Sequence, residues 1–149
     1  MAGTERIPGG VVAGYFDADN DGDTRNIERG PWPALETTEG PAGAIVSTAG
    51  DVARFTSALF GGKLLTPGTV RAMVAEGPHH PRYFNYGLGV EIERPDRETV
   101  AWGHGGYLPG FRSVAWYVPE EQLTIVVLGN ESRANPKDLA ELAPRLVRE

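Results

Sequence analysis

The sequence predicts an α/β protein of the α+β type, with an antiparallel sheet that carries helices on its faces. Two segments in the first half combine helix-capping residues with apolar residues at helical spacing. Beyond Pro81, several short segments have the alternating or continuously apolar pattern of β-strands. A final segment of helical period can cover one face of the resulting sheet.

Length and composition fit one soluble domain over residues 1–149. The formal net charge is -6 and no cluster of Lys and Arg occurs, which argues against nucleic acid or an anionic membrane as a partner. The absence of cysteine excludes disulfides, thiol catalysis and thiolate metal sites. We find neither a membrane-spanning apolar run nor a signal peptide, and no cellular compartment is indicated.

Residues 1–41 are rich in Gly and Pro and have little periodicity. We expect this part to be irregular and loop-rich, with a short strand over residues 11–16. The helices, the sheet and the C-terminal helix are expected within residues 42–149. An irregular segment of this length is uncommon in a compact domain and is often functional.

An acidic loop in this segment has the spacing of an EF-hand calcium loop, D-x-[DN]-x-[DN]-G-x5-E, at Asp17, Asp19, Asp21, Gly22 and Glu28. Carboxylates at this spacing can surround a hard cation. Glycine and proline flank the loop, however, where an EF-hand has helices. The loop is therefore either a helix-free calcium site or a solvated acidic turn, and the turn is favoured because Asp and Gly are common turn residues.

Two helices are expected between residues 48 and 77. Thr48 can cap the first helix with Asp51 in a capping-box arrangement, and Gly61 can end it. Its predicted inward residues are Val52, Phe55 and Leu59. Thr66 and Pro67 begin the second helix, whose predicted inward residues are Val70, Met73 and Val74.

The predicted strands cover residues 86–93, 99–102, 111–118 and 123–128. The last of them is apolar on both faces and must be covered on both. A C-terminal helix after Pro136 can cover one face with its apolar residues Leu139, Leu142, Leu146 and Val147. The helix that begins near Thr48 is the best candidate for the other face.

The segment 101–116 reads A-W-G-H-G-G-Y-L-P-G-F-R-S-V-A-W. We interpret it as the end of one strand, a glycine-rich turn that carries His104, and the start of the next strand. Such a turn directs one side chain and several backbone amides at a single spot, as in many acyl-transfer sites. Glycines are also what a tight turn requires, so the segment alone is ambiguous.

Five segments occur in an order that resembles the C-terminal part of the serine β-lactamase-like, penicillin-recognising hydrolases, in the branch of class C β-lactamases, D-alanyl-D-alanine carboxypeptidases and esterases. These segments are AGAIVSTAGDVARFTSAL (42–59), LLTP (64–67), YGLG (86–89), GHGGYLPGF (103–111) and TIVVLGN (124–130). The resemblance covers nearly all of this chain and less than half of such an enzyme. It implies the C-terminal portion of a β-lactamase/transpeptidase-like fold.

The resemblance also implies the catalytic residues. It places the third active-site motif of the family at His104, Gly105 and Gly106, and one of two oxyanion-hole amides at Tyr107. His104 would lie beside the nucleophile and tune proton transfer or meet a substrate carboxylate. Members that bind a carboxylate-bearing β-lactam usually have Thr or Ser where Gly105 stands, which favours an ester or amide substrate.

The nucleophile motif of the family, Ser-x-x-Lys, does not occur in this sequence. The resemblance therefore implies that the chain contributes a partial site, needs no cofactor or metal, and is inactive alone. The expected partners are a small-molecule or peptide acyl substrate, and either the missing N-terminal half or a second copy, because part of the sheet would be bare. Two alternatives are a non-catalytic binding domain that retains the fold and a calcium-binding module built on residues 17–28.

Overall fold

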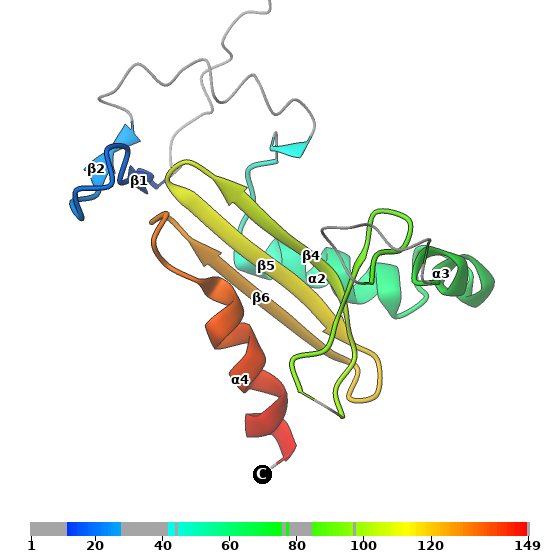
Figure 1. The fold of residues 1–149 in the computed structure, drawn as a ribbon. Helices are drawn as coiled ribbons and strands as arrows, with labels where there is room; N and C mark the ends of the chain where they lie inside the picture. Colours follow the sequence, from blue (N-terminus) through cyan, green and yellow to red (C-terminus); the bar gives the residue numbers. More distant parts are fainter. Residues whose placement is uncertain are drawn as a thin grey trace, which may run out of the picture.

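The computed structural model describes residues 12–27, 42–43, 45–75, 77, 85–96 and 98–148. Its elements are β1 (Tyr15–Phe16), β2 (Arg25–Asn26), α2 (Ala49–Phe60), α3 (Pro67–Met73), β3 (Glu91–Glu93), β4 (Ala101–Leu108), β5 (Phe111–Val118), β6 (Leu123–Gly129) and α4 (Pro136–Arg148). Figure 1 shows α4 on one face of the main sheet and α2 on the other. The predicted α+β architecture is confirmed.

The main sheet is antiparallel and has the strand order β3-β4-β5-β6. Two predicted strands have different bounds in the structure. Of residues 86–93, Glu91–Glu93 form β3, whereas Tyr86 joins Glu91 through an isolated bridge. The strand expected to end at Trp102 instead continues to Leu108, because its pairing with β5 extends to Leu108 and Phe111. A separate β1–β2 hairpin lies within residues 1–41, and β1 occupies the last two residues of the strand expected over residues 11–16, whereas β2 was not predicted.

Helix α2 begins as predicted, since the Thr48 hydroxyl accepts the Asp51 N–H at 3.1 Å. Its buried face differs from the prediction. Phe55 is 58% exposed, and Thr56 and Phe60 are buried in its place. The cause is an aromatic contact, because the Phe60 ring packs against Tyr117 and Trp102 with centroids 6.0 and 6.1 Å away.

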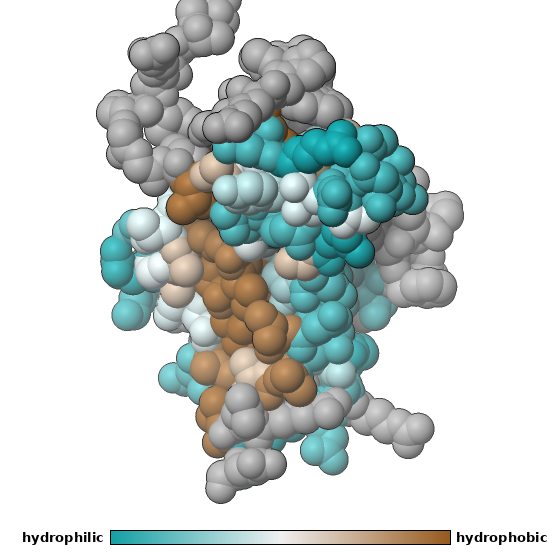
Figure 2. Space-filling view, turned by 90° about the vertical axis from the view of Figure 1, so that its left-hand side faces the viewer, coloured by the Kyte–Doolittle hydropathy of each residue, from teal (hydrophilic) through white to brown (hydrophobic). Residues whose placement is uncertain are grey.

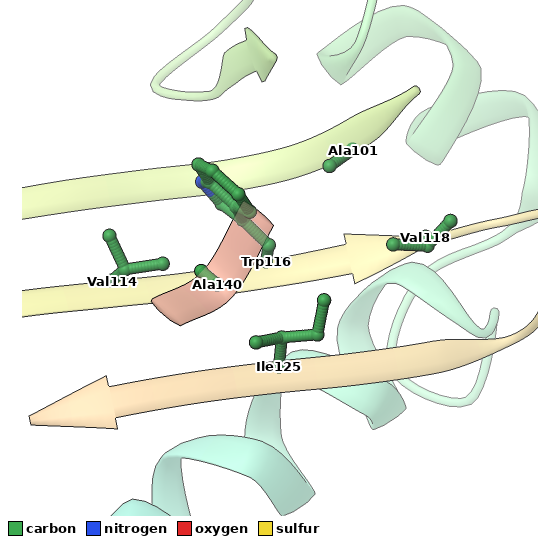
Figure 3. Close-up of a cluster of buried hydrophobic side chains, with 6 residues drawn as sticks. All are labelled: Ala101, Val114, Trp116, Val118, Ile125 and Ala140. Carbon is green, nitrogen blue, oxygen red and sulfur yellow. The ribbon is translucent and has the colours of Figure 1, made fainter. Parts of the chain in front are cut away.

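The α4 face of the sheet carries the larger buried cluster, which Figure 3 shows around the Trp116 side chain. Its residues are Ala101, Val114, Trp116, Val118, Ile125 and Ala140. The alternation predicted for β5 is confirmed, because Val114, Trp116 and Val118 are each 1% exposed. The opposite face carries a second cluster of Phe60, Val70, Val90 and Tyr117.

Helix α4 covers the sheet with a different face from the one predicted. Ala140 and Pro144 are buried and Ala143 packs against the cluster, whereas Leu139 is 62% exposed. Leu142 and Val147 are exposed as well, and the side chain of Leu146 lies outside the described residues. Small side chains let the helix axis approach a sheet that already presents the bulky Trp116. Leu139 and Leu142 of α4 therefore form an exposed apolar ridge.

No helix in the described ranges combines the length and hydrophobicity that crossing a membrane requires.

Asp96 stabilises the turn before β4 through hydrogen bonds to Glu98 and Thr99, and we expect this contact to be pH-dependent. Its carboxylate accepts the hydroxyl and N–H of Thr99 and the N–H of Glu98. The Thr99 hydroxyl bond and these amides lower the pKa of Asp96. A lowered folded-state pKa means that the contribution to stability is present above the unfolded-state value of about 3.9 and is lost as pH falls through the folded-state value.

Asp96→Asn should therefore lower the melting temperature at neutral pH and have a smaller effect near pH 3. Thermal unfolding of both proteins across this range measures the difference. An equal difference at both pH values would contradict a role for the carboxylate charge.

Candidate functional site

The predicted site residues lie inside a strand, and the prediction of a glycine-rich turn at His104 was wrong. Residues 103–106 belong to β4, and the chain reverses later, where Gly110 has a φ of 81°. The earlier glycines allow close strand packing. A Cβ on Gly103 would lie 1.9 Å from the carbonyl oxygen of Ala115, and one on Gly106 would lie 2.3 Å from Ser113 Oγ.

Beyond Gly103, one edge of β4 has no strand partner among the residues that the structure describes. Gly105 N–H points to this edge, where it donates to Glu91 Oε2 at 3.1 Å. Backbone groups of alternate residues in an antiparallel strand point the same way. The Tyr107 N–H therefore also faces the open edge. An oxyanion-hole donor must be held in a fixed position and be accessible to the substrate. A backbone N–H at an open strand edge meets both requirements.

His104 lies beside this edge with an exposed side chain. Its Nε2 is 2.9 Å from the Tyr86 hydroxyl, and the two rings meet edge to face with centroids 5.7 Å apart. Its Nδ1 donates to the Gly105 carbonyl oxygen and lies 3.8 Å from Glu91 Oε1. The imidazole is thus oriented by a phenol on one side and has a carboxylate near the other nitrogen, an arrangement that can move a proton.

Glu91 is a site residue that the sequence did not indicate. It is only 8% exposed, and it joins the Gly105 amide, His104 and the Lys137 ammonium, whose Nζ is 3.8 Å from its Oε2. The strand sequence alone does not predict this role for Glu91, because the role depends on how β3 pairs with β4. Tyr86 could have been found, since it begins the Y-G-L-G segment.

Lys137 places a positive charge next to Glu91 and also binds the Glu93 carboxylate. Burial lowers the pKa of Lys137, but the hydrogen bond to Glu93 and the charges of Glu93 and Glu91 outweigh it, so the pKa is raised above its usual value. The ammonium therefore stays charged at neutral pH and links α4 to β3.

The acidic loop has three of its predicted calcium ligands close together. One carboxylate oxygen from each of Asp17, Asp19 and Asp21 lies within 4.8 Å of the others, and Glu28 lies outside the described residues. The Arg25 guanidinium binds Asp19 at 3.1 Å and Asp21 at 2.6 Å. Asp17 accepts the N–H groups of Asp21 and Gly22. The cluster thus has internal partners without a cation.

We expect excess calcium to leave the melting temperature unchanged, because a cation would have to displace the Arg25 guanidinium. Thermal unfolding with calcium and with chelator tests this expectation. Asp17→Asn is the matched control. A rise in melting temperature that this substitution abolishes would support the calcium-module alternative.

The model of the beta-lactamase family matches residues 3–147. A D-stereospecific amidohydrolase from Streptomyces sp. is 26% identical, with a TM-score of 0.57 over 64% of this chain and 29% of that one. A D-amino acid amidase from Ochrobactrum anthropi SV3, complexed with L-phenylalanine amide, is 22% identical, with a TM-score of 0.60 over 80% of this chain and 35% of that one. No curated protein matches. The chain thus spans about a third of the length of these structures.

Proposed function

Because the chain belongs to the beta-lactamase family, we propose that it supplies the third active-site motif and one oxyanion-hole amide of a serine hydrolase. The observation that carries this proposal is the open edge of β4, where the Tyr107 N–H points outward close to His104. The proposed catalytic set is His104, Gly105, Gly106 and Tyr107. We also propose that residues 1–149 are the C-terminal part of one hydrolase domain.

The proposed reaction proceeds through an acyl-enzyme. A serine oxygen attacks the substrate carbonyl carbon, and the resulting oxyanion accepts a hydrogen bond from the Tyr107 N–H. One such donor contributes about 3 kcal/mol to transition-state stabilisation. The amine or alcohol then leaves with a proton, and water attacks the acyl-enzyme to release the acid and regenerate the serine. His104, held by Tyr86, assists the proton transfers.

We propose an amide or ester of a small molecule or peptide as the substrate. The similar structures are named as a D-stereospecific amidohydrolase and a D-amino acid amidase, and another structure of the amidase is a complex with D-phenylalanine. Gly105 supports the same choice, because it has no hydroxyl to offer a β-lactam carboxylate.

The nucleophile would lie on polypeptide outside these 149 residues, since the sequence has no Ser-x-x-Lys and the matched part covers only 29% and 35% of the two similar structures. The test compares this chain with the longer polypeptide that includes the residues encoded upstream. We expect p-nitrophenyl acetate and D-phenylalanine amide to be hydrolysed by the longer polypeptide alone. A fluorophosphonate probe should label its upstream serine. Turnover by the 149-residue chain would refute the partial site, whereas inactivity of the longer polypeptide would favour a non-catalytic binding domain.

We propose that the surface on the β6 side binds a partner, which is either the missing N-terminal half or a second copy of this chain. Strand β6 ends the sheet, and Figure 2 shows a continuous hydrophobic strip on this side of the molecule. Leu128 of β6 and Leu139, Leu142 and Val147 of α4 are exposed. Unpaired apolar strand edges and large apolar patches favour association.

We therefore expect the isolated chain to self-associate and the double substitution Leu139→Glu/Leu142→Glu to shift it toward monomer. Sedimentation velocity over a concentration series measures the change. Leu64→Glu, at an exposed leucine between α2 and α3, is the control and should not alter the distribution. A single sedimenting species with the mass of the monomer, for the unmodified chain at high concentration, would contradict the expectation.

A further inference from the structure

An open pocket of about 340 Å³ lies where the β1–β2 loop meets the β4–β5 hairpin. We call it the arginine pocket. Its lining includes Phe16, Asp17, Tyr107, Arg112, Ser132 and Arg133. Tyr107 thus contributes to both sites. Its backbone N–H faces the proposed oxyanion site at the open edge of β4, and the residue also lines the arginine pocket.

The guanidinium groups of Arg112 and Arg133 are each oriented by a hydrogen bond to a carbonyl oxygen, and each retains N–H donors for a ligand. Arg112 donates from Nε to the Ser132 carbonyl oxygen at 2.9 Å, and its guanidinium lies 4.1 Å from the centre of the Tyr107 ring. Arg133 donates from Nη1 to the Gly22 carbonyl oxygen. Within the described ranges, the Nη groups of Arg112 and the Nη2 group of Arg133 make no hydrogen bond. The pocket therefore presents oriented donors.

The acidic residues nearby already have partners. Both carboxylate oxygens of Asp17 accept backbone N–H groups of their own loop, and Asp19 and Asp21 are paired with Arg25. None of these contacts uses a guanidinium group of the pocket. The two arginines are thus free to bind an anion from outside.

We infer that the arginine pocket binds a carboxylate carried by the substrate. Planar guanidinium groups bind carboxylates through paired, charge-assisted hydrogen bonds. The position next to the Tyr107 amide lets one substrate place its scissile carbonyl at the strand edge and its carboxylate in the pocket. This inference rests on the proposed hydrolase function and adds the charge of the preferred substrate.

The test is a titration of the isotope-labelled 149-residue chain with N-acetyl-D-phenylalanine and with its neutral amide. We expect the acid to shift the amide resonances of Gly22, Tyr107 and Ser132 and the Nε–Hε resonance of Arg112. The neutral amide should bind about tenfold more weakly or worse. The double substitution Arg112→Gln/Arg133→Gln should weaken binding of the acid by a similar factor.

Two further variants keep the result interpretable. Arg133→Gln alone changes an exposed residue and should weaken binding of the acid, even if the loss of Arg112 disturbs the hairpin. Arg71→Gln, at an exposed arginine of α3, is the matched control and should bind as the unmodified chain does.

Equal affinity for acid and amide, or undiminished binding by Arg133→Gln and by the double variant, would overturn the inference. The proposed hydrolase function fails on a different result, in which the longer polypeptide hydrolyses neither p-nitrophenyl acetate nor D-phenylalanine amide and its upstream serine is not labelled by the fluorophosphonate probe. The two failures are therefore distinguishable.

Discussion

Replacing Trp116 with alanine is expected to lower the free energy of unfolding by about 3–5 kcal/mol. Trp116 is 1% exposed and lies at the centre of the cluster between the sheet and α4, with Val114, Val118, Ile125 and Ala140 around it (Figure 3). Its indole N–H has no hydrogen-bond partner in the described part of the chain. The loss would therefore be one of packing and buried area, with a cavity left under α4.

Urea unfolding followed by circular dichroism measures this change, and Phe55→Ala is the matched control. Phe55 is a large aromatic residue that sequence periodicity places inside, but it is 58% exposed. We expect its substitution to cost less than about 1 kcal/mol, as is usual for a surface position. Equal losses for the two variants would contradict the burial of Trp116 in β5 and the exposure of Phe55 in α2.

The Trp116 substitution should also affect the site. Trp116 pairs with Gly103 across the sheet, directly before His104. A collapse of the core at this point would shift β4 relative to β3 and weaken the Gly105–Glu91 hydrogen bond. The amide resonance of Gly105 should report this shift even in the absence of activity.

The sheet was predictable because its signal is local. In β5, Val114, Trp116 and Val118 pack in the cluster under α4, and this period of two is visible in the sequence itself. The caps of α2 and α3 were predictable for the same reason, since Thr48 and Thr66 bond to amides three residues away.

The buried faces of the helices were not predictable from apolar spacing alone. In α4, Ala140 and Ala143 contact the sheet, while the larger Leu139 and Leu142 face outward. The alanines and the leucines are all apolar, so hydrophobicity alone does not say which of them face the sheet. The alanines face it because the bulky Trp116 side chain lies beneath the helix and leaves room only for small residues.

The backbone around the candidate site was not predictable from the sequence. His104 and Tyr107 remain predicted site residues that rest on the family resemblance, whereas the glycines around them were interpreted as a turn and lie in strand β4. Gly103 and Gly106 instead accommodate Ala115 and Ser113 of β5, and these contacts depend on a strand register that no single segment encodes. Glu91 was missed for the same reason.

Replacing His104 with alanine in the longer polypeptide is expected to lower kcat/KM for D-phenylalanine amide by about 10²–10⁴-fold, the range of general acid–base catalysis. The side chain is exposed, so the fold should survive, and an unchanged melting temperature would show this. The loss should fall mainly on kcat, because proton transfer is needed in the transition state more than in substrate binding.

Tyr86→Phe separates catalysis by His104 from its positioning. This substitution keeps the ring that contacts His104 and removes the hydroxyl that lies 2.9 Å from Nε2. We expect a smaller loss of kcat than for His104→Ala and a changed pH profile, because the hydrogen bond that fixes the imidazole is gone. If His104→Ala retains full activity in the longer polypeptide, the imidazole has no part in proton transfer. The Tyr107 amide would then be the main contribution of this chain to catalysis, since a backbone donor does not depend on the side chain three residues before it.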